Sequence, residues 1–94
     1  AAIAQQVLAA YLEHQRARAA LSQQAVALAA ATEAYRVTSD LFRVGRATGT
    51  DLIEAESGLL DAKLGDVNAH IDLSVSRVAL EHATARDRAG APAP

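Results

Sequence analysis

The fold is decided by the stretch Val44-Gly45-Arg46-Ala47-Thr48-Gly49-Thr50-Asp51, which combines a helix stop with a helix start. Gly45 suits the position just after a helix, where φ is usually positive. Thr48 or Thr50 can cap the next helix by accepting a hydrogen bond from its first turn, and the helix dipole favours Asp51 there. Because few residues separate the two signals, the flanking helices are expected to be antiparallel neighbours.

The sequence on either side of this stretch predicts two long helices. Alanine, the strongest helix former, occurs 24 times in the 94 residues, and Gly and Pro are rare before residue 90. We expect one helical hairpin over residues 1–89, with helices over about 2–44 and 51–88 and a turn at 45–50. Residues 90–94, which read Gly-Ala-Pro-Ala-Pro, are expected to form a disordered or frayed tail.

The first helix carries a heptad pattern. Larger residues recur every seven positions, at Val7, His14, Leu21, Leu28, Tyr35 and Phe42. Small or polar residues lie between them, at Ala10, Ala17, Gln24, Ala31 and Thr38. This alternation predicts a closely packed helix–helix seam with a left-handed supercoil. A histidine within the seam is expected to set the register or to face a neighbouring helix.

The second helix carries three lines of residues. A line of large residues comprises Ile53, Leu60, Leu64, Val67, Ile71 and Val78. A nearly opposite line of small residues comprises Ala55, Gly58, Ala62, Gly65, Ala69, Ser76 and Ala83. A third line widens the apolar surface with Leu52, Leu59, Leu73 and Leu80. Glycines inside a helix cost about 1 kcal/mol each relative to alanine, which makes sense where another backbone approaches closely. We therefore expect neighbours on two sides of this helix. The predicted fold class is an all-α, long antiparallel two-helix coiled-coil hairpin that associates with further helices.

Composition and spacing favour no enzyme, metal, cofactor or nucleic-acid site. The net charge of −2 is too near neutral to suggest nucleic acid. There is no cysteine, and none of His14, His70 and His82 has another histidine four residues away. Asp66 and His70 could share a helix face, but two ligands do not make a metal site. The serines have no adjacent base, so no catalytic residue is assigned.

The charged residues near the turn have two interpretations. Asp51, Glu54 and Glu56 follow the start of a helix, where the dipole favours acids. Alternatively, a symmetric assembly would repeat them as an acidic ring around a pore. Arg43 and Arg46 are either solvated side chains at a helix end or contacts to a partner at the turn.

Together these residues resemble the TolC family of outer-membrane efflux proteins. The resemblance covers roughly residues 3–88 and rests on the order and spacing of its parts. Those parts are Ala34-Tyr35, Leu41-Phe42-Arg43-Val44-Gly45, Thr48-Gly49-Thr50-Asp51-Leu52-Ile53-Glu54-Ala55-Glu56 and Leu59-Leu60-Asp61-Ala62-Lys63-Leu64. The upstream Ile3-Ala4, Val7 and Ala10-Tyr11-Leu12 are similar to the start of the same family helix.

The resemblance implies that the chain is one periplasmic hairpin of a trimeric outer-membrane channel in the Gram-negative envelope, for drug efflux or type I secretion. The hairpin tip would dock the hairpins of a periplasmic adaptor and so connect indirectly to an inner-membrane transporter. The implied docking residues are Arg43, Val44, Gly45, Arg46 and Thr48. The implied pore-entrance residues are Phe42, Asp51 and Glu54. An arginine that helps to hold the gate shut in the family would fall at Ala47, beside Arg46.

Two alternatives remain open from the sequence. One is a coiled-coil hairpin of the periplasmic adaptor itself, whose tips commonly carry Arg-x-x-x-Leu; here Arg43 is followed four residues later by Ala47. The other is an unrelated coiled-coil oligomerisation module, since Ala-rich heptads are common.

Overall fold

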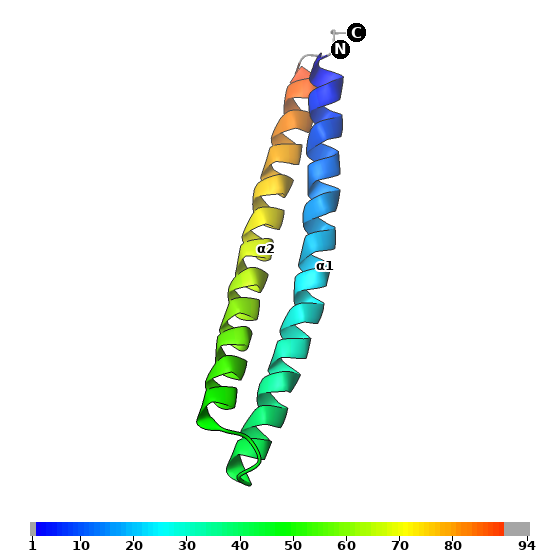
Figure 1. Cartoon of the computed structure of the whole chain (residues 1–94). Helices are drawn as coiled ribbons and strands as arrows, with labels where there is room; N and C mark the ends of the chain where they lie inside the picture. Colours follow the sequence, from blue (N-terminus) through cyan, green and yellow to red (C-terminus); the bar gives the residue numbers. More distant parts are fainter. Residues whose placement is uncertain (1, 90–94) are drawn as a thin grey trace. The chain divides into compact units, whose positions relative to one another are not determined.

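The computed structural model describes residues 2–89, which form two α-helices joined by a short turn (Figure 1). Helix α1 spans Ala2–Arg43 and helix α2 spans Gly49–Ala89. The described residues contain no β-strand. The predicted all-α antiparallel hairpin is confirmed. The tail predicted at 90–94 lies outside the described residues.

The chain divides into two compact units, and each contains a segment of both helices. The turn unit consists of residues 22–68 and includes the connection between α1 and α2. The end unit, as far as it is described, consists of residues 2–21 and 69–89. In each unit a segment of α1 packs along a segment of α2 that runs in the opposite direction.

The heptad line predicted on α1 forms its inner face. In the end unit Ala17 is buried, with only 2 % of its surface exposed, and its heptad neighbours are half-buried. In the turn unit the half-buried heptad residues are Gln24, Leu28, Ala31, Tyr35 and Thr38. The line ends there, because Phe42 is 44 % exposed. The prediction that Phe42 continues the seam is wrong, since α1 ends one residue later and α2 only begins at Gly49.

The inner face of α2 differs from the one that its largest residues suggest. The residues that face inward come from the small line and the leucine line, with half-buried Asp66 at the leucine-line position between Leu59 and Leu73. They are Leu52, Ala55, Leu59, Ala62, Gly65, Ala69, Leu73, Ser76, Leu80 and Ala83. Of these, Ala69, Ser76 and Ala83 are buried. The six residues of the large line are instead 53–65 % exposed. Small side chains allow the two helices to approach closely, and the leucines fill the gaps between them.

Only one of the two interior glycines of α2 is explained by this seam. A Cβ atom added to Gly65 would lie 2.5 Å from the Gln24 side-chain oxygen, so the glycine makes room for that amide. A Cβ atom added to Gly58 would meet nothing within 4 Å. Within the hairpin, therefore, neither glycine shows the close backbone approach that was expected, and Gly65 instead accommodates a side chain of α1.

A polar contact lies within the seam of the end unit. The Ser76 hydroxyl donates to the Leu73 carbonyl at 2.8 Å, and His14 Nδ1 lies 3.2 Å from the same oxygen. While the Ser76 hydroxyl donates to Leu73, its oxygen can only accept from His14, which requires the tautomer with a proton on Nδ1. The prediction that His14 faces a neighbouring helix is confirmed, with α2 as that helix.

Candidate docking site at the helical turn

The turn begins with a left-handed glycine that closes α1. Gly45 has φ of +77°, and its N–H donates to the Phe42 carbonyl at 3.1 Å. The Arg46 N–H donates to the Leu41 carbonyl at 2.8 Å. These two bonds form a Schellman motif, which satisfies carbonyls that a helix end otherwise leaves without a partner. The position of Arg46 is thereby fixed by a hydrogen bond of its backbone N–H.

The turn ends with a reciprocal cap on α2. The Asp51 N–H donates to Thr48 Oγ1 at 3.0 Å, and the Thr48 N–H donates to Asp51 Oδ2 at 2.9 Å. Of the two threonines that the sequence offered as caps, Thr48 is therefore the one used, and α2 begins at Gly49. The Thr48 backbone N–H, followed by its side chain, holds the pKa of Asp51 below its ordinary value. The arrangement corresponds to a capping box with aspartate in the acidic position.

Apolar side chains are exposed where α1 reaches the turn. Val44 is 70 % exposed and Phe42 is 44 % exposed, while Leu41 is 39 % exposed. The Arg43 side chain forms an ion pair with Asp40, which also pairs with Arg36 at 3.1 Å. Because the side chains of Arg43 and Asp40 remain 74 % and 47 % exposed, the pair adds little stability and leaves the guanidinium accessible.

A shallow hollow of ≈ 470 Å³ lies beside the turn, between the end of α1 and the start of α2. It brings Arg46 together with Asp51 and Glu54, two of the residues predicted at a pore entrance. The remaining lining residues are Thr38, Leu41, Ala47 and Ala55. None of these four was assigned to the site from the sequence. Leu41 could have been found from the sequence, since a Schellman motif that ends at Gly45 brings the residue four before the glycine next to Arg46.

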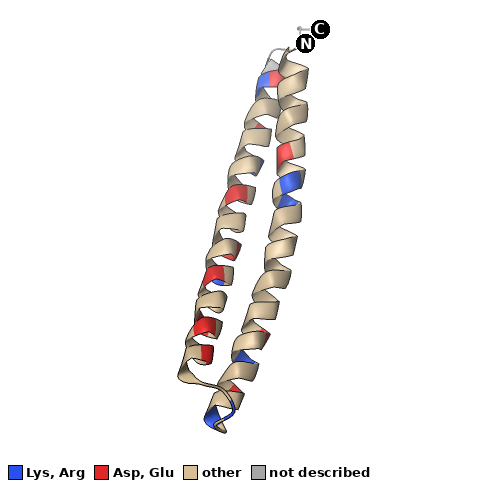
Figure 2. Cartoon of the chain, in the orientation of Figure 1, with Lys and Arg blue, Asp and Glu red and all other residues tan. Residues whose placement is uncertain are grey.

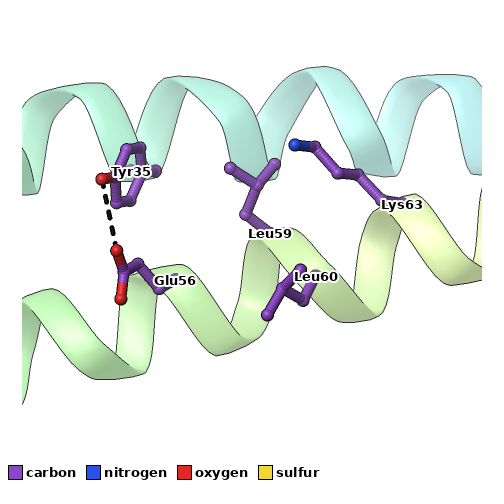
Figure 3. A pocket seen from close by; sticks show the side chains of 5 residues that line it. All are labelled: Tyr35, Glu56, Leu59, Leu60 and Lys63. Carbon is purple, nitrogen blue, oxygen red and sulfur yellow. Dashed lines mark hydrogen bonds between the residues drawn. The ribbon is translucent and has the colours of Figure 1, made fainter.

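The three acids that follow the turn make different contacts, although Asp51 and Glu54 line the same hollow. Asp51 caps α2, Glu54 lines the hollow, and Glu56 accepts a hydrogen bond of 3.4 Å from the Tyr35 hydroxyl. Figure 3 shows this last bond across a second hollow, of ≈ 380 Å³, which Leu59, Leu60 and Lys63 also line. Asp51 is therefore bonded to Thr48, while Glu54 is the acid of the predicted pore entrance whose carboxylate no described contact occupies.

The described residues contain no group of three or more metal-binding side chains. Nor does either described helix contain a stretch long and apolar enough to cross a membrane. Comparison with known proteins found no matching family model, curated protein or solved structure. The geometry of the turn and the sequence pattern are therefore the basis for any functional assignment.

Proposed function

We propose that the chain is a periplasmic hairpin of a TolC-like outer-membrane channel and that its turn docks a periplasmic adaptor. Such a channel would serve drug efflux or type I secretion and assemble as a trimer. The proposal rests on the sequence resemblance across residues 3–88. The observation that supports it best is the turn itself, a short connection closed by local hydrogen bonds that exposes Val44 between Arg43 and Gly45.

A turn of this kind suits docking because its shape is set before a partner arrives. The Schellman motif fixes the end of α1 and the capping box fixes the start of α2. A preorganised loop loses less conformational entropy on binding than a mobile one. Val44 supplies an apolar contact, and Arg43 and Arg46 supply donors for carbonyl or carboxylate groups of a partner hairpin.

The hollow beside the turn supports a role at the channel entrance. Glu54 lines this hollow, and threefold repetition would place three such carboxylates around one axis. A ring of like charges raises the local concentration of cations and favours their passage. In this proposal Asp51 acts mainly on the turn, because its carboxylate is already bonded to Thr48.

Site-specific crosslinking in the full-length parent protein tests the docking proposal. We expect Val44→Cys to crosslink to the turn of an adaptor hairpin in an assembled pump. Ala79→Cys is the matched control, because Ala79 is exposed on α2 but belongs to the end unit. Equal crosslinking at both positions, or none at Val44, would overturn the proposal.

A coiled-coil oligomerisation module is the second candidate, and the exposed large line of α2 favours it. The parent gene discriminates between the candidates. A second copy of the hairpin motif, with alternating strands between the copies, supports the channel. A single hairpin flanked by lipoyl-like strands indicates the adaptor instead. A hairpin with neither of these contexts indicates the oligomerisation module.

A further inference from the structure

The outer face of α2 in the turn unit carries an apolar stripe that no described residue covers. This outer stripe consists of Ile53, Leu60, Leu64 and Val67, which are 64, 65, 60 and 53 % exposed. Their spacing of seven, four and three residues places them on one side of a helix. The seam with α1 uses Leu52, Leu59 and the small residues on the other side. A helix with apolar residues on two sides has a second packing surface.

One edge of the outer stripe is acidic. Glu54 follows Ile53 and Asp61 follows Leu60, so the two acids recur at the same place on successive heptads. Both are exposed, and neither forms an ion pair with another described residue. The opposite edge carries Glu56 and Lys63. Figure 2 shows acidic positions along the part of α2 that follows the turn.

We propose that the outer stripe docks an amphipathic helix of another protein whose apolar seam is flanked by lysine or arginine. The apolar seam of that helix would pack on the four stripe residues. Its basic edge would lie along Glu54 and Asp61. Opposite charges that flank the apolar seam between two helices select the partner and its orientation. This proposal uses only the stripe and its charges, so it does not depend on the channel assignment. It is an alternative to the channel-entrance role of Glu54, because a docked basic edge would cover that carboxylate.

Charge argues against two other occupants. The turn unit contains seven acidic and four basic residues, so two copies that paired through their outer stripes would bring like-charged edges together and repel each other there. An anionic membrane surface would repel the acidic edge in the same way, since helices that lie on membranes carry basic residues beside their apolar face. A basic amphipathic helix would be stabilised both by the apolar stripe and by its acidic edge.

Two synthetic helical peptides with the same leucine seam test the proposal, one with lysine and one with glutamate along its edges. We expect the lysine peptide to bind the chain several-fold more tightly, because its edge attracts Glu54 and Asp61 whereas the edge of the glutamate peptide repels them. Glu54→Lys with Asp61→Lys should reverse the preference. Leu60→Gln with Leu64→Gln should abolish binding of both peptides, and glutamine keeps a helix propensity close to that of leucine.

Fluorescence anisotropy gives the affinities, circular dichroism checks that each variant stays helical, and sedimentation gives the oligomeric state. Equal affinity for both peptides, or binding unaffected by the glutamine substitutions, would overturn the proposal. A chain that self-associates and becomes monomeric on Leu60→Gln with Leu64→Gln would show that a second copy is the occupant instead. If the glutamine variant loses helicity, the lysine variants decide the question, because they leave the stripe unchanged.

Discussion

Gly45 and Gly58 are both glycines of the hairpin, but only Gly45 has a backbone conformation that favours glycine. Gly45 has φ of +77°, whereas Gly58 lies within α2 with open space around it. We expect Gly45→Ala to destabilise the hairpin by about 1 kcal/mol, because a Cβ atom is disfavoured in the left-handed region. Gly58→Ala should stabilise it by up to about 1 kcal/mol through helix propensity. Urea denaturation of both variants measures the difference, and the same sign for both would contradict this account.

Asp51 makes the start of α2 sensitive to acid. Its pKa is lowered because its carboxylate accepts a hydrogen bond from the Thr48 backbone N–H. A carboxyl with a lowered folded-state pKa stabilises the fold above its unfolded-state pKa, and that stabilisation is lost as the pH falls through the folded-state pKa. We therefore expect the first amides of α2 to exchange faster with solvent as the pH falls below the ordinary aspartate range.

Hydrogen exchange must be corrected for its intrinsic pH dependence before this comparison. Asp51→Asn should remove the effect, because asparagine does not titrate. If the acid sensitivity at the start of α2 persists in that variant, it belongs to other carboxyls.

At the scale of the element, the face of α2 that meets α1 can be tested with two alanines. Ala69 is 6 % exposed in the seam, and Ala79 is exposed on the same helix. We expect Ala69→Leu to destabilise the hairpin by about 1–3 kcal/mol, because the larger side chain forces the helices apart. Ala79→Leu should change stability by less than about 0.5 kcal/mol. Thermal unfolding of the two variants checks this, and equal effects would mean that the small line is not the seam.

The helices and the α1 seam were predictable from the sequence because one heptad line dominates α1. The seam of α2 was not, because that helix carries two apolar lines at helical spacing and periodicity alone does not say which one α1 covers. The small line faces α1 because Ala69, Ser76 and Ala83 allow a shorter distance between the helices than Leu60 and Leu64 would.

The turn was predictable as a helix stop followed by a helix start, although its details depend on the backbone geometry. The sequence allowed either Thr48 or Thr50 as the cap, and only the backbone selects Thr48. The hollow that brings Arg46 to Glu54 depends on how the two helix ends face each other. The spacing of the residues does not predict how the two helix ends face each other.

At the scale of the whole molecule, the hairpin has a thin core. The buried residues are Ala17, Ala69, Ser76 and Ala83, and no side chain of the described residues is both large and fully buried. Alanines bury little apolar area, so a single hairpin gains little to offset the entropy of ordering two long helices. We expect helicity measured by circular dichroism to fall on dilution, because association supplies the missing burial. A sample that sedimentation shows to be monomeric and that is fully helical would contradict this expectation.

The bonds of the turn also bear on how the chain folds. The capping bonds join residues three apart, the Tyr35–Glu56 bond joins residues 21 apart, and the His14–Ser76 contact joins residues 62 apart. Closing a chain segment costs more entropy as it lengthens, so contacts between distant residues form most easily after nearer ones have shortened the open loop. The Schellman motif and the capping box therefore make the turn the natural nucleus. Pairing of the helices then proceeds outward from Gly45, and the contact between His14 and Ser76 forms late.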